Sequence, residues 1–303
     1  MARWLITGVT GLLGSNAALA LAGNHEVIGA ARSRPHAAAI EFVPVDLASA
    51  SSRSGLVGRA NADVVLHTAA VSSIEAAEAD PELAHELNVV AAADLARQAL
   101  DHGARFVHIS TDAVFDGVRG HYTESDPVSP MNAYGRTKAE SEEAVLDAAP
   151  DSLVARVNFY GWSPTGSRSL AEFFYNALRV GRPVFGFRDV SVSTLQVSAL
   201  VHSLVGLVGV GAAGVTHVVS SEPIDKFTFG RRLANRLELD AELISPASST
   251  DHLENARGQH LDLVTSKAER LLGRKLPTQQ EGLDRLADEL ASGWQDRVHA
   301  FRS

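Results

Sequence analysis

The chain has 303 residues, of which 45% are hydrophobic and 21% are charged, with a formal net charge of −9 and a pI near 5.7. This composition is typical of a globular protein with a substantial core, and the lack of a basic patch argues against a nucleic-acid partner. Cysteine is absent, which excludes disulfides, thiolate nucleophiles and cysteine-ligated zinc, so we expect a reducing, cytoplasmic location.

Two apolar segments resemble targeting or membrane signals, and we expect neither to act as one. Residues 1–23 loosely mimic a signal peptide, but their glycines recur at a fixed spacing. Ala199–Val215 is short for a membrane span and contains His202, Ser203 and four glycines. We predict a buried helix that ends in a glycine loop there, and therefore no membrane partner.

Short apolar runs alternate with helical stretches through the first half of the chain. Strands are predicted at residues 3–7, 25–31, 41–47, 62–70, 105–111 and 152–161. Helices are predicted before Gly23, from Pro81 to His102 and through Lys138–Leu146. The strands are unbroken apolar runs, as in a parallel sheet that helices cover on both faces. The pattern therefore predicts an α/β fold with a doubly wound, Rossmann-type parallel sheet.

The sequence changes character after Tyr160, where a polar loop precedes an amphipathic helix at residues 170–183. The C-terminal part is mostly helical and charged. We predict an NAD(P)-binding core in residues 1–160 and a smaller, mainly substrate-binding region in residues 161–303. Later strands near residues 183–187 and 215–220 are candidates to join the core sheet.

Gly8, Gly11 and Gly14 directly follow the first predicted strand, in the sequence TGVTGLLG. In a strand–turn–helix unit, the first glycine permits the tight turn, the second lets the backbone approach a pyrophosphate, and the third lets helix and strand pack closely. The free N–H groups of the following helix favour phosphate binding. The spacing in this context predicts a dinucleotide-binding loop, with a simple strand-to-helix turn as the alternative.

The end of the second strand indicates which dinucleotide binds. Ala31 stands where an acidic residue would bind the ribose 2′-hydroxyl of NAD, and Arg32, Ser33 and Arg34 follow it. Arginine there accepts the 2′-phosphate of NADP, so we predict a preference for NADP(H), with NAD(H) or a merely solvated loop as alternatives. Asp46, which closes the third strand, is predicted either to bind the adenine amino group or to cap a turn.

Tyr134 and Lys138 lie four residues apart, so on a helix they share one face. Reduction of a ketone needs a hydride, which a nicotinamide supplies, and a proton from a general acid beside the carbonyl oxygen. A nearby lysine is expected to lower the tyrosine pKa and to bind the nicotinamide ribose. Ser110 and Thr111 end the fifth strand, at the sheet edge where ligands bind, and offer a hydroxyl to orient the carbonyl.

Taken in this order along the chain, the motifs resemble the extended short-chain dehydrogenase/reductase superfamily, and within it most of all the dTDP-4-dehydrorhamnose reductase family. The resemblance rests on TGVTGLLG, on STDAVFDG with YTESDPVSPMNAYGRTKAE, and on LGRKLPTQQEGLDRL. It covers nearly the whole chain and is most specific from Ser110 to Glu140. It implies an NAD(P)-binding core, a small C-terminal substrate region and reduction of the 4-keto group of a nucleotide-activated deoxysugar.

The same resemblance implies roles for individual residues. Thr111, Tyr134 and Lys138 would form a catalytic trio in which Tyr134 donates the proton. The residues expected at the cofactor are Gly8, Thr10, Gly11, Leu12, Leu13, Gly14, Arg32, Ser33, Asp46, Leu47, Thr68, Ala69, Ala70, Tyr134 and Lys138. Within that set, residues 11–13 would line the pyrophosphate, 46–47 the adenine and 68–70 the nicotinamide side. The residues expected at the sugar are Thr111, Asp112, Tyr134 and Phe159.

Three positions near the expected substrate pocket depart from the family pattern. Ala113 replaces the usual tyrosine, Phe159 stands where a tryptophan is frequent, and the stretch SIEAAE keeps Glu75 and Glu78 but lacks a lysine. These departures leave the hydride chemistry intact and the identity of the ketone open. The alternatives are a reductase, epimerase or dehydratase acting on another ketone in specialised metabolism, and a non-catalytic NADP-binding regulatory subunit.

The 12 histidines are scattered, and no pair combines metal-ligand spacing with carboxylates, so the sequence predicts no metal site. His67, His108 and His217 lie in or beside apolar strands and are expected to be structural. By the same resemblance, the charged helical run at residues 138–149 and the helix before Gly103 are expected to pair across a homodimer.

Overall fold

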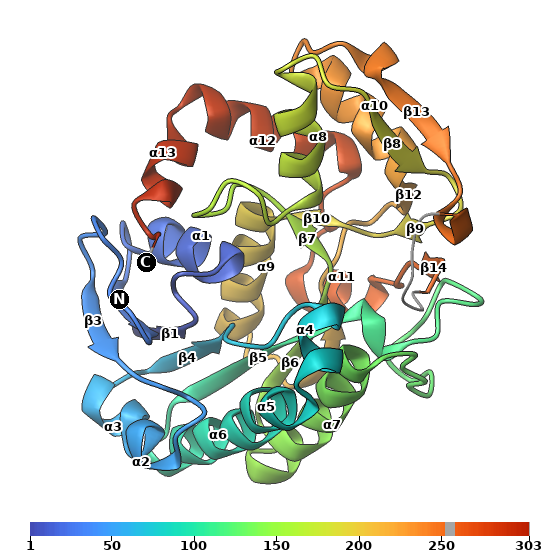
Figure 1. Ribbon diagram of the computed structural model, residues 1–303. Helices are drawn as coiled ribbons and strands as arrows, with labels where there is room; N and C mark the ends of the chain where they lie inside the picture. The colour runs from blue at the N-terminus through green and yellow to red at the C-terminus, as the bar shows by residue number, and fades with distance from the viewer. Residues whose placement is uncertain (252–257, 303) are drawn as a thin grey trace.

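The computed structural model describes residues 1–251 and 258–302. Its centre is a sheet of seven parallel strands in the order β11–β6–β5–β4–β1–β2–β3 (Figure 1). The strands are β1 (Arg3–Thr7), β2 (Glu26–Ala31), β3 (Glu41–Pro44), β4 (Val64–His67), β5 (Arg105–Thr111), β6 (Leu153–Val157) and β11 (Gly214–His217). The strand order reverses between β1 and β4, the point where such sheets bind dinucleotides. The predicted doubly wound parallel fold is confirmed.

Helices cover both faces of this sheet, which explains why its strands are apolar throughout. One face packs against α1 (Leu12–Leu21) and α9 (Val197–Gly209), and the other against α3 (Leu56–Ala60), α6 (Ala91–Asp101) and α7 (Ala133–Ala148) (Figure 1). Neighbouring residues of β1 serve the two faces, since Ile6 belongs to the first hydrophobic cluster and Leu5 to the second.

The predicted helix from Pro81 to His102 is interrupted by a π-helical turn. The segment consists of α5 (Pro81–His85), the π-helix η1 (Glu86–Val90) and α6, and it follows α4 (Ile74–Ala79). The turn places Asn88 against α7, where Nδ2 donates to Thr137 Oγ1 at 2.9 Å and to Val71 O at 3.1 Å. Such turns are frequent at functional sites.

The chain after β6 forms smaller sheets and a helical layer. These elements are β7 (Phe159–Tyr160), α8 (Leu170–Leu178), β8 (Val184–Phe187), β9 (Ser191–Val192), β10 (Leu195–Gln196), β12 (Ile224–Asp225), α10 (Lys226–Arg236), β13 (Ile244–Ala247), β14 (His260–Leu261), α11 (Ser266–Leu272), α12 (Gln279–Ala291) and α13 (Trp294–His299). The aromatic residues Trp162, Phe174 and Phe229 centre their own hydrophobic cluster. The chain then returns to the core, where Trp294 Nε1 donates to Asn16 Oδ1 at 2.8 Å.

The two later strands proposed for the core sheet have different outcomes. The segment near residues 215–220 supplies β11, which pairs with β6. The segment 183–187 does not join the sheet and instead pairs, as β8, with β13. Its side chains alternate between buried and exposed, with Phe185 56% exposed, and this pattern suits a strand covered on one face only.

The apolar segment after Ala199 forms α9, whose residues Leu200, Leu204 and Leu207 are buried against the sheet. Within the part of the chain that the structure describes, no helix has the length and apolar character needed to cross a membrane.

Candidate active site

The glycine loop lies between β1 and α1, at the carboxyl edge of the sheet. Gly8 has φ of +68°, and a Cβ there would lie 2.8 Å from the backbone of Ala69 after β4. A Cβ on Gly14 would collide with the carbonyl of Gly8. Gly11 precedes the first turn of α1 in an extended conformation, without a side chain that caps its N–H groups. The loop therefore offers the close backbone approach and free amides that a pyrophosphate requires.

The remaining residues predicted around this loop are placed as follows. Thr10, Gly11 and Leu12 are partly exposed, whereas the Leu13 side chain is buried in the core. Only the backbone of Leu13 is therefore left to contact a cofactor. Thr68, Ala69 and Ala70 are partly exposed beside the loop. Thr68 Oγ1 donates to Thr7 O at 2.7 Å, which ties the end of β4 to the start of the loop.

The residues predicted at the adenosine end lie along the β2–β3 edge. Arg32 and Ser33 are exposed at the end of β2, and the guanidinium of Arg34 lies 5.2 Å from the centre of the Phe42 ring. Asp46 is exposed, and its Oδ1 accepts a hydrogen bond from Ala48 N at 3.1 Å, so it has the turn role that was one of its two predictions. The adjacent Leu47 is buried. Recognition of adenine and of the 2′-phosphate stays a prediction.

Thr111 ends β5 and Tyr134 opens α7, and the fold brings their hydroxyls together. The Thr111 hydroxyl hydrogen-bonds the Tyr134 side chain and also donates to Asp112 Oδ1 at 3.0 Å. Burial raises the pKa of Tyr134 to about 12, although the Thr111 contact acts in the opposite direction. The phenol is protonated at neutral pH, as a free tyrosine is, and the raised pKa makes it a weaker acid.

Lys138 lies one turn further along α7 and is only 2% exposed. Its Nζ lies 3.0 Å from Nε2 of His108 on β5. Burial lowers the pKa of Lys138 to about 7, against the opposing charge of Glu142. The expectation that Lys138 lowers the pKa of Tyr134 is not met, because burial dominates at Tyr134 and the lysine amine is directed to β5.

Asp112 is a buried carboxyl beside this hydroxyl pair. Its Oδ2 accepts from Asn158 Nδ2 at 2.6 Å. Burial raises the pKa of Asp112 to about 6, opposed by hydrogen bonds from Asn158 and Thr111 and by the charge of Lys226 at the start of α10. Sequence reasoning missed Asn158 and Lys226. Asn158 directly follows β6, at the same sheet edge as Thr111, whereas the predicted strand at residues 152–161 ran through this position and hid it.

Ser110 was the second candidate hydroxyl, and in the structure it hydrogen-bonds Glu142 instead. Its Oγ donates to Glu142 Oε1 at 2.5 Å, and Glu142 forms an ion pair with Arg156 at 2.7 Å whose two side chains are both about 5% exposed or less. The Arg156 guanidinium in turn lies 4.9 Å from the centre of the Phe115 ring. Thr111 is therefore the hydroxyl that remains for a substrate.

The positions that depart from the family pattern have structural partners. A Cβ on Gly135 would collide with the carbonyl of Ala113, so these two segments pack backbone to backbone. Glu78 Oε1 accepts from Ala133 N at 2.7 Å and thereby fixes the start of α7. Phe159 is partly buried and packs against the cluster beneath α1 and α9. Its contact with a substrate stays a prediction.

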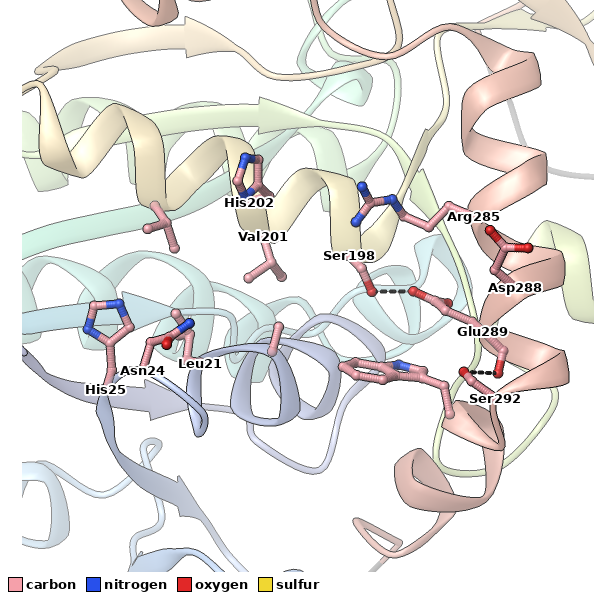
Figure 2. A pocket seen from close by; sticks show the side chains of 13 residues that line it. Leu21, Asn24, His25, Ser198, Val201, His202, Arg285, Asp288, Glu289 and Ser292 are labelled. Carbon is pink, nitrogen blue, oxygen red and sulfur yellow. Dashed lines mark hydrogen bonds between the residues drawn. The ribbon is translucent and has the colours of Figure 1, made fainter.

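A separate pocket of about 470 Å³ lies where α1, α9 and α12 meet (Figure 2). Glu289 Oε1 accepts from Ser198 Oγ at 2.5 Å and its Oε2 accepts from Gln196 Nε2 at 2.9 Å, which anchors α12 to the start of α9. His25 and His202 line the other end of the pocket (Figure 2). The described residues around it include no member of the predicted catalytic or cofactor sets, because those sets lie at the sheet edge.

The fold, the glycine loop, the Thr111–Tyr134 hydroxyl pair and the nearby Lys138 define the protein as a Rossmann-type oxidoreductase. The chain belongs to the family described as RmlD substrate binding domain, which matches residues 2–292.

Several characterised and solved proteins are similar to it. The probable low-salt glycan biosynthesis reductase Agl14 of Haloferax volcanii is 30% identical over 92% of this chain and 95% of its own length. A dTDP-4-keto-6-deoxy-D-glucose reductase of Streptomyces niveus is 32% identical over 82% and 83%. The methionine adenosyltransferase 2 subunit beta of Rattus norvegicus is 28% identical over 91% and 84%. A crystal structure of a hypothetical dTDP-4-dehydrorhamnose reductase from Sulfolobus tokodaii is 26% identical over 92% and 98%, with a TM-score of 0.81.

Proposed function

We propose that this protein is an NADP(H)-preferring ketoreductase that reduces the 4-keto group of a nucleotide-activated deoxysugar. The observation that carries the proposal is the hydroxyl pair of Thr111 and Tyr134, with buried Lys138 one helical turn away, at the same carboxyl edge of the sheet as the glycine loop. The Streptomyces relative, a dTDP-4-keto-6-deoxy-D-glucose reductase, supports a keto-sugar substrate, and the Haloferax relative, a probable reductase of glycan biosynthesis, supports a reduction in sugar metabolism. The solved dTDP-4-dehydrorhamnose reductase of Bacillus anthracis, which has the same fold with a TM-score of 0.84, is a complex with NADP.

The residues of this chain fit a nicotinamide dinucleotide. Gly8 and Gly14 have no room for a side chain, and the amides at the start of α1 would hold the pyrophosphate. Arg32 and Ser33 would bind the 2′-phosphate, and residues 68–70 would lie beside the nicotinamide. When bound, the reduced nicotinamide supplies the hydride.

The protein side of the reaction is proton delivery and orientation. Tyr134, which is protonated at neutral pH, donates its proton to the carbonyl oxygen as negative charge develops there. The Thr111 hydroxyl turns from Asp112 to the same oxygen and orients it. Lys138 would bind the cofactor ribose hydroxyls through its amine.

Replacing Tyr134 with Phe tests this assignment, because it removes the proton donor and keeps the ring. We expect turnover to fall by about two to four orders of magnitude. NADPH should still bind, as measured by calorimetry, because the glycine loop that holds the pyrophosphate is unchanged. Near-normal turnover of the variant with dTDP-4-keto sugars would refute the role of Tyr134.

The identity of the ketone belongs to the same proposal and is open to direct assay. Ala113 and Phe159 depart from the family pattern near the substrate, which motivates a different ketone as the second enzymatic reading. Wild-type protein is assayed for NADPH oxidation with dTDP-, UDP- and GDP-linked keto sugars. Oxidation with one nucleotide class identifies the substrate, and no oxidation with any of them favours the alternative.

A second function is favoured by the similarity to a subunit of methionine adenosyltransferase. In that reading the chain binds NADP and regulates a larger enzyme without turnover. Stable co-purification with such an enzyme, together with no hydride transfer to any keto sugar, would support it. The intact set of Thr111, Tyr134 and Lys138 favours catalysis.

We also propose a cytoplasmic homodimer in which residues 1–160 bind the cofactor and residues 161–303 mainly bind the substrate. The cysteine-free composition supports the location. The charge of Lys226, which acts on Asp112 from α10, supports a substrate site shared by the two parts.

A further inference from the structure

Lys138 has an unusual partner for a buried amine. Its side chain is 2% exposed, and its Nζ lies 3.0 Å from the Nε2 atom of His108, which is itself fully buried. A lysine ammonium has three donors and no acceptor, so Nε2 must be the unprotonated nitrogen when Lys138 is charged. The ring proton of His108 then sits on Nδ1, which has no hydrogen-bond partner within the described part of the chain.

The His108 ring is held firmly in this orientation. Ser141 Oγ donates to the carbonyl of Lys138, one turn back along α7, at 2.7 Å, and the same oxygen lies 2.8 Å from Nε2 of His108. On its other side the ring stacks on His67, with centres 5.6 Å apart and planes 19° apart. The acceptor therefore has little freedom to leave the lysine amine.

The stacked pair also reaches the cofactor loop. His67 Nδ1 lies 2.8 Å from Thr7 Oγ1, and Thr7 directly precedes Gly8. The two imidazoles thus form a buried layer from Lys138 on α7 to the end of β1. Burial lowers the pKa of both histidines, that of His67 to about 3, so the layer is neutral at physiological pH.

We propose that His108 is a positioning residue that, as a neutral imidazole, accepts a hydrogen bond from the Lys138 ammonium and so holds this amine, charged, where it meets the cofactor ribose. The consequence for reduction rests on the proposed function, whereas the hydrogen bond itself does not. His67 supports the ring of His108 by stacking and does not contact the amine.

The expected effect follows from what the acceptor does to the lysine. The ionisable groups around the amine are His108 on β5, His67 on β4, and Tyr134 and Glu142 one turn away on α7 in either direction. Of these, Glu142 favours the ammonium and burial opposes it. Replacing His108 with Phe removes the acceptor and keeps an aromatic ring for stacking. A lost hydrogen bond to a charged group should lower the Lys138 pKa by about one unit or more.

The chain offers a clean measurement, because it has only four lysines, at positions 138, 226, 267 and 275. Protein labelled with carbon-13 at lysine Cε is titrated by NMR, with Lys138 assigned by its loss in Lys138→Met. In His108→Phe the Lys138 titration should shift downward by about one unit or more, and in the matched control His67→Phe it should stay within about 0.3 units. In His108→Gln, whose side-chain oxygen can accept, it should largely recover. An unchanged titration in folded His108→Phe overturns the proposal.

Wild-type protein supplies a test that needs no variant to fold. In nitrogen-15 histidine spectra at pH 6, where Lys138 is charged, His108 should carry its proton on Nδ1 and a bare Nε2. A protonated Nε2 overturns the proposal. Calorimetry with NADPH then checks the consequence, which is roughly tenfold weaker binding to His108→Phe than to the wild type or to His108→Gln. Absence of keto-sugar reduction by the wild type would refute the proposed function alone, because none of these measurements uses a substrate.

Discussion

Asp112 offers a test of whether the hydroxyl pair lies in a water-poor site. Its carboxyl is 4% exposed and accepts hydrogen bonds from Asn158 and Thr111, yet burial raises its pKa from 3.8 to about 6. That rise corresponds to about 3 kcal/mol by which the buried charge destabilises the folded state. The folded pKa lies above the unfolded one, so this penalty is fully present above pH 6 and disappears as pH falls towards 4.

The perturbation is Asp112→Asn, which keeps the shape and removes the ionisation. The free energy of unfolding is measured by urea titration from pH 4 to pH 8 for the wild type and the variant, and for the exposed control Asp151→Asn. Between pH 8 and pH 4, the wild type should gain about 2.5 kcal/mol relative to Asp112→Asn. The lost hydrogen bonds add a constant offset that does not depend on pH. A wild-type-minus-variant difference that is flat across this range refutes the reasoning, because Asp112 would then be solvated.

Two further substitutions test the cofactor site. Gly14→Ala should lower the free energy of unfolding by about 1–3 kcal/mol and abolish NADPH binding, because its Cβ would collide with the Gly8 carbonyl. In the control Gly23→Ala, the new Cβ meets no atom within 4 Å, so stability and binding should change little. Equal stability and NADPH affinity in the two variants would contradict the packing argument. Arg32→Ala should raise the KM for NADPH about tenfold and leave the KM for NADH nearly unchanged. Arg179→Ala is the control, since Arg179 is also exposed and basic. An equal rise in KM for both cofactors would show that Arg32 does not recognise the 2′-phosphate.

The core sheet was predictable because its signal is local and repeated. Most strands are apolar runs and most crossovers carry helix-forming residues, so the fold class and the first six strands follow from the pattern. The sequence pattern did not predict where the helix around Tyr134 begins, since its start depends on partners distant in sequence. Asn132 caps it locally, but Glu78 Oε1 reaches Ala133 N from 55 residues earlier in the chain. The prediction that residues 183–187 join the core sheet failed for a similar reason, because the strand they pair with, β13, lies some 60 residues further along the chain.

The candidate site shows the same limit at atomic scale. The sequence order of glycine loop, strand-end hydroxyls and tyrosine predicts which residues gather at the sheet edge. It does not predict which of Ser110 and Thr111 stays available. Successive residues of a strand point to opposite faces, and Ser110 shares with His108 the face that α7 covers. Ser110 therefore meets Glu142 and is used in the ion pair with Arg156, whereas Thr111 meets Tyr134.

The direction of the Tyr134 pKa depends on the same geometry. Spacing by four residues places Tyr134, Lys138 and Glu142 along one face of α7, and that much is readable from the sequence. The partner of each side chain is set by β5, which has the Thr111 hydroxyl at its end and the His108 imidazole three residues earlier. The lysine amine bonds to the imidazole, so the phenol is left with burial as its largest influence and its pKa rises. The raised pKa makes the phenol a weaker acid, so burial reverses the direction that the spacing of Tyr134 and Lys138 predicts.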